Sequence, residues 1–205
     1  MSKINKVVLM YPNQRWQKVD SHTTWNLSIS TLCLLAAMLD KEIEIKIIDA
    51  QFYDLSVEEL KKQIKEFNPD MVGISVLTTE YHTIGDVAAQ AVKEVNKDIL
   101  TVLGGVHVTL MPKKVLENSD VDYAVVGEGE YVFKQLIEHL NGKGELPSIG
   151  LAYKNGSKIV LPEMQALVDD LNALPMPRYD LVDYKAYTMT LARTGGTDVS
   201  PELPY

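Results

Sequence analysis

The sequence predicts an α/β fold of the flavodoxin-like type, a doubly wound five-stranded parallel sheet with the strand order 2-1-3-4-5. Five short apolar runs lie between residues 6 and 127, and near-continuous apolar character is typical of parallel strands that are buried on both faces. Segments with helical patterning separate these runs, which implies right-handed crossovers between the strands. Five strands favour the flavodoxin-like order over the six-stranded dinucleotide-binding fold.

Each expected element has a local signal. The strands are predicted at residues 6–11, 42–50, 70–77, 99–105 and 121–127. The helices are predicted at residues 26–40, 56–70, 79–96, 111–119 and 130–144. Ser56 and Glu59 form a capping-box pair at the start of the second helix, and Asn68-Pro69 ends it. Pro112 near the start of the fourth helix is a favourable first-turn residue.

The pattern changes after residue 145, so the sequence predicts three parts. Residues 1–145 form the α/β domain, and residues 146–162 form a β-hairpin around Asn155-Gly156, a strong hairpin signal. Residues 163–205 are punctuated by prolines and are predicted to be an extended linker with a fraying end. The polar end resembles an interrupted chain more than a finished domain.

Composition excludes several classes of function. The chain has 28 acidic and 20 basic residues, a net charge of −8, which argues against a nucleic-acid-binding face. No apolar run approaches the roughly 20 residues that span a bilayer, and no signal-peptide pattern is present, so we expect no membrane association. Cys33 is the single cysteine. A disulfide framework is therefore excluded, a cytoplasmic location is expected, and the chain alone cannot ligate an iron–sulfur cluster.

Small and polar residues gather where the predicted strands end. Ser75, Leu77, Thr78 and Thr79 lie at the end of the third strand, Gly104-Gly105 end the fourth, and the fifth ends in the GEGE run at 127–130. Ligands of open parallel sheets bind beyond these carboxyl ends, and glycines let a ligand approach the backbone. Neither G-x-G-x-x-G nor the P-loop motif is present, and the two glutamates of GEGE would repel a phosphate.

Taken together, these motifs resemble a known family. They are YPN at 11–13, SVLTT at 75–79, GGVHVT at 104–109, Pro112 and VGEGE at 126–130. Their order and spacing resemble the N-terminal cobalamin-binding domain of cobalamin-dependent radical S-adenosylmethionine (SAM) enzymes. The likeness covers residues 5–190, including a linker that resembles the segment leading to the radical SAM domain.

The resemblance implies a cofactor, a site and a reaction class. Cobalamin (vitamin B12) would insert its nucleotide tail between the first and third strands, and the enzyme would transfer a methyl group. The implied cofactor-binding residues are Tyr11, Pro12, Ser75, Val76, Leu77, Thr78, Thr79, Gly104, Gly105, Val106, His107, Gly127, Glu128 and Gly129. The C-x-x-x-C-x-x-C motif of the radical SAM half is absent. A radical SAM domain, in cis or in trans, with its 4Fe-4S cluster and S-adenosylmethionine, is therefore an expected partner, and this chain is not catalytic alone.

Two histidines are weighed as cofactor contacts. His22 stands in DSHTTW, which resembles the D-x-H-x-x-G motif that supplies a lower axial cobalt ligand in other cobalamin proteins, but Trp25 replaces the glycine. His22 is therefore either a cobalt ligand or a chance match in a loop. His107 either contacts the cofactor or is a helix-start residue satisfied by the backbone.

Two other functions remain open at this point. A flavodoxin-like domain could bind FMN or a sensor ligand, but it should carry a compact phosphate loop after the first strand. An interaction module with a decayed pocket is the other alternative, and the intact glycines at 104–105 and 127–129 argue against it.

Overall fold

The computed structural model describes residues 3–16, 29–77 and 82–187. Its strands form one seven-stranded sheet in the order β2-β1-β3-β4-β5-β6-β7. The strands are β1 (Lys6–Tyr11), β2 (Glu44–Asp49), β3 (Met71–Ser75), β4 (Leu100–Gly104), β5 (Tyr123–Val125), β6 (Leu151–Asn155) and β7 (Lys158–Val160). The first five are parallel, so the predicted order 2-1-3-4-5 is confirmed.

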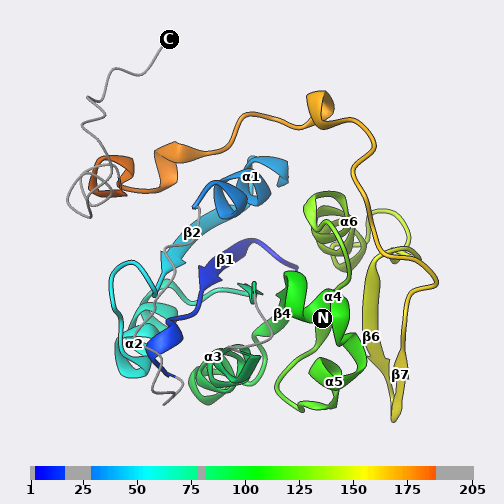
Figure 1. Ribbon diagram of the computed structural model, residues 1–205, viewed down its shortest axis with the longest axis horizontal. Helices are drawn as coiled ribbons and strands as arrows, with labels where there is room; N and C mark the ends of the chain where they lie inside the picture. The colour runs from blue at the N-terminus through cyan, green and yellow to red at the C-terminus, as the bar shows by residue number, and fades with distance from the viewer. Residues whose placement is uncertain (1–2, 17–28, 78–81, 188–205) are drawn as a thin grey trace.

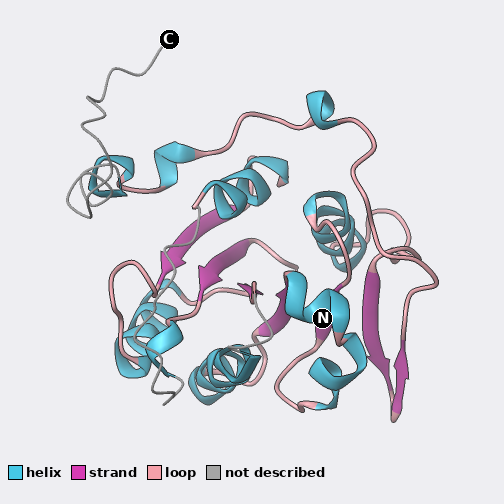
Figure 2. Cartoon of the chain, viewed as in Figure 1, coloured by secondary structure: helices cyan, strands magenta, loops and turns pink. Residues whose placement is uncertain are grey.

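The predicted hairpin is present and extends the sheet. β6 pairs antiparallel with β5, and β7 pairs antiparallel with β6. Because Asn155 pairs with Lys158, the two-residue turn is Gly156-Ser157, one residue later than the sequence signal suggests. Figure 2 shows the hairpin at the edge of the sheet.

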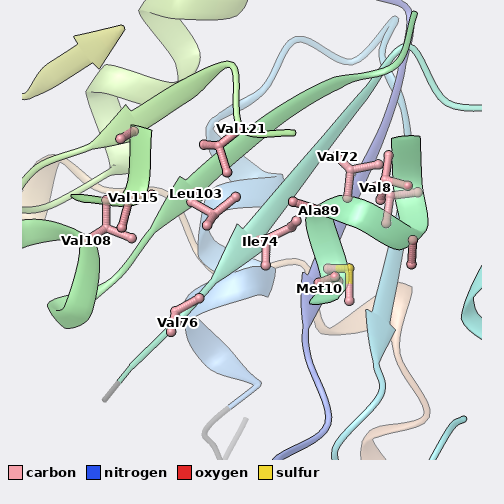
Figure 3. Close-up of a cluster of buried hydrophobic side chains, with 14 of the residues drawn as sticks. Val8, Met10, Val72, Ile74, Val76, Ala89, Leu103, Val108, Val115 and Val121 are labelled. Carbon is pink, nitrogen blue, oxygen red and sulfur yellow. The ribbon is translucent and has the colours of Figure 1, made fainter. Parts of the chain in front are cut away.

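Helices cover both faces of the sheet (Figure 1). They are α1 (Ser30–Met38), α2 (Val57–Phe67), α3 (His82–Val95), α4 (Val106–Leu110), α5 (Pro112–Glu117) and α6 (Glu130–Leu140). Buried residues of α2, α3, α4 and α5 belong to one core cluster, whereas those of α1 and α6 belong to the other. Figure 3 shows part of the first cluster, where Val8, Ile74 and Leu103 of the sheet meet Ala89 of α3 and Val108 of α4. The capping box of Ser56 and Glu59 is confirmed at the start of α2.

The segment after β4 differs from the prediction. The sequence analysis assigns no helix to residues 106–110, whereas the structure forms α4 there, directly after Gly105, so that His107 lies at a helix start. The predicted fourth helix is present as α5, with Pro112 as its first residue. A helix of five residues is too short to show the apolar periodicity by which helices are recognised in a sequence, which explains why α4 was missed.

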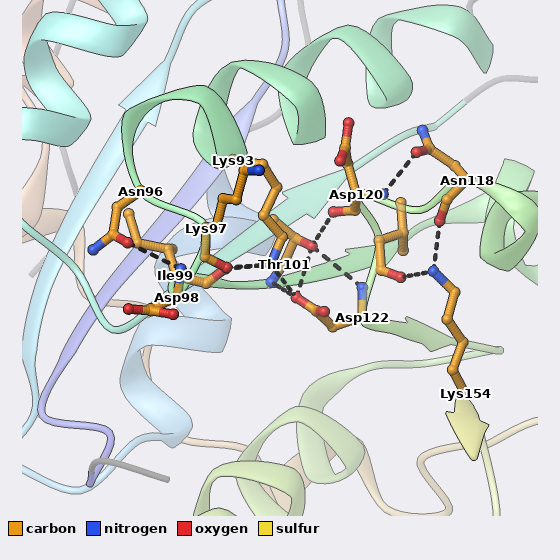
Figure 4. A network of polar contacts seen from close by, with 11 residues as sticks. Lys93, Asn96, Lys97, Asp98, Ile99, Thr101, Asn118, Asp120, Asp122 and Lys154 are labelled. Carbon is orange, nitrogen blue, oxygen red and sulfur yellow. Dashed lines mark hydrogen bonds and ion pairs between the residues drawn. The ribbon is translucent and has the colours of Figure 1, made fainter. Parts of the chain in front are cut away.

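A polar network fixes the amino ends of β4 and β5 (Figure 4). Lys93 Nζ and Thr101 N both donate to Asp122 Oδ2, at 2.7 and 2.8 Å. Lys154 Nζ of β6 donates to the carbonyl oxygens of Asn118 and Val121, both at 2.6 Å. Each of these groups has a protein partner, so the network stabilises the fold. It lies at the amino ends of the strands, opposite to their carboxyl ends.

The chain after the hairpin packs back onto the domain; we call residues 164–187 the C-terminal strap. Ala166 forms a parallel bridge with Gly127. Figure 1 shows the strap as the orange segment that passes α1. There Arg178 N donates a hydrogen bond to Cys33 O of α1 at 2.9 Å. The strap includes two 3-10 turns, Leu171–Ala173 and Tyr179–Leu181. Residues 164–187 of the segment predicted as a linker thus pack against the sheet and α1.

The far end of the strap reaches β2. Tyr187 stacks on Phe52, with 3.9 Å between ring centroids, and its hydroxyl donates to Asp49 Oδ2 at 3.1 Å. Asp49 is buried, and burial raises the pKa of its carboxyl.

None of the described helices combines the length and apolar character that a membrane crossing requires.

Candidate functional site

A pocket of about 220 Å³ opens at the carboxyl ends of β3, β4 and β5. The sheet supplies its floor, and α1 and α6 supply two of its walls. Its lining is mostly apolar side chains and glycines: Leu9, Thr31, Leu32, Leu35, Gly73, Ile74, Ser75, Leu77, Val102, Gly104, Gly105, Val125, Gly127, Glu128, Gly129, Glu130 and Phe133. A concave, apolar site with few polar groups at strand ends is the usual form of a ligand pocket in this class of fold.

Two adjacent glycines at the end of β4 have different surroundings. A Cβ built on Gly104 would meet only Val125 Cβ, at 3.8 Å, so a side chain there would occupy the open pocket. Gly105 has φ +99°, and a Cβ would lie 2.5 Å from the carbonyl oxygen of Val76. The Val76 carbonyl also accepts from His107 N at 3.3 Å, so it is held in place. Gly104 therefore leaves room for a ligand, whereas Gly105 is required by the chain itself.

The glycine after β5 is also required by the chain. Gly127 has φ +93°, and a Cβ would collide with the backbone of Ala166 in the strap. Glu128 N donates to Ala166 O at 2.8 Å, and the Glu128 carboxylate accepts from Val168 N. Gly127 N in turn donates to Thr109 Oγ1 at 2.9 Å. The loop after β5 is thus held between α4 and the strap, and its position sets one wall of the pocket.

A fourth glycine lies in the floor of the pocket. Gly73 lies within β3, and a Cβ there would approach Leu9 Cδ2 at 3.0 Å and Phe133 Cζ at 3.2 Å. A glycine inside a strand marks a place where another group approaches the backbone closely. Here the missing side chain lets Leu9 and Phe133 of α6 pack closely against β3.

Four lining residues carry polar side chains: Thr31, Ser75, Glu128 and Glu130. Within the described part of the chain, Glu130 Oε2 is buried and has no hydrogen-bond partner. Glu130 is the first residue of α6, where the helix dipole favours a negative charge. The pocket therefore offers one carboxylate oxygen to a donor that the described residues do not supply.

The structure brings together half of the predicted cofactor-binding residues. Those that line the pocket are Ser75, Leu77, Gly104, Gly105, Gly127, Glu128 and Gly129. Among the described residues, five others lie outside the pocket lining: Tyr11, Pro12, Val76, Val106 and His107. Thr78, Thr79 and the possible cobalt ligand His22 fall outside the described residues. In the ranges 3–16, 29–77 and 82–187, no group of three His, Cys, Asp or Glu side chains could hold a metal ion.

Three residues singled out by the sequence lie in the interior. His107 is 8% exposed and belongs to α4. Tyr11 is buried at the end of β1, and burial raises the pKa of its phenol to about 12. Burial likewise raises the pKa of the Cys33 thiol to about 11, so this thiol stays protonated at neutral pH. Cys33 is therefore a buried core residue with a weakly reactive thiol.

Sequence reasoning missed the helical walls of the pocket. Thr31, Leu32 and Leu35 come from α1, and Phe133 from α6. These apolar positions have no local signal, because any core-facing helix has similar residues. Gly73 could have been found from the isolated glycine in an apolar strand, and Glu130 from the GEGE run.

Comparison with known proteins identifies the domain. The model of the B12 binding domain matches residues 29–137, more than half of the 205-residue chain. The chain belongs to the B12-binding domain family. The matched region runs from the start of α1 to α6 and so includes every helix and strand that lines the pocket apart from β1. Cobalamin is the cofactor of this family, as the sequence predicts.

Curated relatives of this B12-binding domain include methyltransferases. An uncharacterized methyltransferase of Pyrococcus horikoshii is 37% identical over 158 residues, covering 76% of this chain and 34% of that protein. Cytidylyl-2-hydroxyethylphosphonate methyltransferase of Streptomyces wedmorensis is 29% identical over 184 residues, covering 79% of this chain and 34% of that protein. The B12-binding domain thus spans about a third of the length of these relatives.

Solved structures share the fold of the B12-binding domain. The cobalamin-dependent S-adenosylmethionine radical enzyme OxsB, with aqua-cobalamin bound, matches with a TM-score of 0.68 and 20% identity, covering 87% of this chain and 24% of that one. The radical S-adenosylmethionine methyltransferase TsrM of Kitasatospora setae, with cobalamin and a [4Fe-4S] cluster bound, matches with a TM-score of 0.62 and 20% identity, covering 88% and 34%. The predicted resemblance to this group of enzymes is confirmed at the level of the fold.

The residues of the pocket fit part of a cobalamin molecule. Gly104 leaves its wall open, and Glu130 offers a buried oxygen without a partner among the described residues. A pocket of about 220 Å³ is smaller than the roughly 300–1,000 Å³ of sites that enclose a whole drug-sized ligand. It therefore suits one arm of a large cofactor and not the corrin ring.

Proposed function

We propose that this B12-binding domain holds cobalamin by its nucleotide tail, as part of a radical SAM methyltransferase-like enzyme. The observation that carries the proposal is the glycine-lined pocket at the carboxyl ends of β3, β4 and β5. Ser75, Gly104 and Gly129 would face the tail, and the apolar side chains of α1 and α6 would enclose its aromatic base. When bound, the corrinoid would carry the methyl group that is transferred.

The methyl transfer itself would need a second domain. The relatives that support this step are methyltransferases of which this chain spans about a third, and Cys33 is the single cysteine of the chain. We propose that a radical SAM domain, in cis or in trans, supplies the 4Fe-4S cluster and S-adenosylmethionine. The B12-binding domain would then present the corrinoid to that domain.

The pocket favours cobalamin over FMN. A flavodoxin-like FMN site needs a cradle of donors for a terminal phosphate, whereas Glu128 and Glu130 place two carboxylates at this pocket. These carboxylates would repel the negative charge of a phosphate group in the pocket. The neutral parts of a cobalamin tail, its sugar and base, suit such a lining better than a terminal phosphate does.

Reconstitution tests the proposal. The purified protein is incubated with hydroxocobalamin, desalted, and examined by visible spectroscopy, with FMN as a parallel ligand. We expect corrinoid absorbance to be retained near one equivalent and FMN to be lost. Cobinamide, which lacks the nucleotide, should bind more weakly than cobalamin. A colourless protein after desalting would refute cobalamin binding, and equal affinity for the two corrinoids would refute holding by the tail.

A further inference from the structure

Glu130 has a polar group that the described protein does not use. Its Oε2 atom is buried and lacks a hydrogen-bond partner among the described residues, and its side chain lines the pocket. Burying a carboxylate oxygen without a donor is unfavourable, because the hydrogen bonds that water would make are lost. Such a group is retained most readily where a ligand supplies the missing donor.

The neighbouring glutamate shows the contrast. Glu128 also lines the pocket, but its carboxylate accepts a hydrogen bond from Val168 N in the strap. Its backbone N–H is used as well, by Ala166 O at 2.8 Å. Glu128 therefore holds the strap in place, and Glu130 is left to meet the ligand.

The charge of Glu130 restricts what that ligand group can be. A carboxylate accepts hydrogen bonds and repels phosphate. The matching group is a hydroxyl or an N–H. The other lining groups near Glu130 are Gly129, Val125 and Phe133, which offer an apolar surface for a flat ring beside that donor. Rotation about the last bond of the side chain exchanges the two oxygens, so either can receive the donor.

We propose that Glu130 accepts a hydrogen bond from a hydroxyl group of the cobalamin nucleotide tail and thereby selects corrinoids that carry a nucleotide. This inference rests on the proposed cobalamin binding. In this proposal the first residue of α6 recognises the sugar of the tail. The phosphate of the tail would lie away from the GEGE loop. The corrin ring, which exceeds the pocket, would lie outside it.

Substitution of Glu130 combined with a change of ligand tests this proposal. Glu130→Gln keeps the shape and one acceptor oxygen, and Glu130→Ala removes both oxygens. Glu138→Gln is the matched control, because Glu138 lies on the same helix and pairs with Lys134 at 3.8 Å, outside the pocket lining. Each protein is titrated with hydroxocobalamin and with cobinamide by visible spectroscopy. Apo-protein folding is verified by circular dichroism.

We expect Glu130→Ala to weaken hydroxocobalamin binding about tenfold or more, with a smaller loss for Glu130→Gln, since a hydrogen bond to a charged acceptor is lost or weakened. Affinity for cobinamide should stay at the wild-type value in both variants, and Glu138→Gln should match the wild type with both ligands. The thermal midpoint of apo Glu130→Gln should stay within about 4 °C of the wild type, because losing the favourable helix-dipole interaction and removing the unpaired carboxylate oxygen act in opposite directions.

Three results would overturn the proposal. Unchanged hydroxocobalamin affinity in Glu130→Ala would show that Glu130 accepts no bond from the cofactor. Equal losses for both corrinoids would place the donor on the corrin side chains and not on the tail. A thermal midpoint of apo Glu130→Gln lowered by more than about 4 °C, beyond what the loss of the helix-dipole interaction explains, would show that the carboxylate serves the fold. Wild-type protein that binds neither corrinoid would instead refute the proposed function.

Discussion

Replacing Gly104 and Gly105 one at a time with alanine should separate ligand binding from folding. The two glycines are adjacent in sequence at the end of β4, yet their surroundings differ. The added methyl group at position 104 would enter the open pocket, with its nearest neighbour, Val125 Cβ, at 3.8 Å. At position 105 it would lie 2.5 Å from the carbonyl oxygen of Val76.

The expected changes in unfolding free energy follow from these surroundings. Gly105 has φ +99° and ψ −179°, a region that only glycine occupies readily, and such strain costs about 1–3 kcal/mol. The clash involves backbone atoms of Val76, which cannot turn aside as a side chain would, so we expect a loss of about 3 kcal/mol. Gly104→Ala should change the unfolding free energy by less than about 1 kcal/mol, because a compatible glycine-to-alanine change mainly restricts the unfolded chain.

Urea denaturation and cobalamin titration form the assay. With a slope near 2 kcal/mol per molar urea, the loss for Gly105→Ala corresponds to a midpoint lowered by roughly 1.5 M. Gly104→Ala should keep the wild-type midpoint and bind hydroxocobalamin about tenfold more weakly, since one methyl group crowds a fitted pocket. The reasoning is refuted if Gly105→Ala is as stable as the wild type, or if Gly104→Ala lowers the midpoint as much as Gly105→Ala does.

Three further predictions concern the groups around the site and the sheet. Thr109→Val removes the hydroxyl that accepts from Gly127 N at 2.9 Å, so urea denaturation should show a loss of about 1–3 kcal/mol, and Thr109→Ser should recover it. Burial raises the pKa of Asp49 above its ordinary value of 3.8, so the native state binds this proton more tightly than the unfolded state. The contribution of this proton to stability is therefore present below pH 3.8 and lost as pH rises through the raised pKa. The unfolding free energy of Asp49→Asn should therefore rise relative to that of the wild type as pH increases over this range. A constant difference in unfolding free energy from pH 3 to 8 would contradict this. Asp122→Ala leaves Lys93 Nζ without its carboxylate at 2.7 Å and should cost about 2 kcal/mol in the same denaturation assay, with wild-type affinity for cobalamin.

The sheet was predictable because its signals are local. Each parallel strand is a short apolar run, and the turn at Gly156 and the capping box at Ser56 are recorded in neighbouring residues. The exception, α4, shows the limit of such signals. It follows Gly105 without a side-chain cap and lasts five residues, so neither capping nor periodicity marks it.

The pocket was predictable at its rim and not at its walls. Strand ends are local features, and Ser75, Gly104 and Gly129 were found there. Leu35 and Phe133 come from helices that meet only after the chain has folded. Their contact depends on how α1 and α6 pack, in part through the space above Gly73, and apolar patterning gives no information about that packing.

A glycine motif at strand ends also has two physical meanings that the sequence does not separate. Gly104 borders open space, whereas Gly127 is required because the strap backbone at Ala166 passes against it. The same loop lines the pocket and holds the strap, since Glu128 bonds to Ala166 and Val168. The wall of the pocket beside β5 is therefore built partly by chain that follows the hairpin. The fit of a cofactor against this wall would therefore depend on the position of the strap, because any movement of Ala166 changes the surroundings of Gly127.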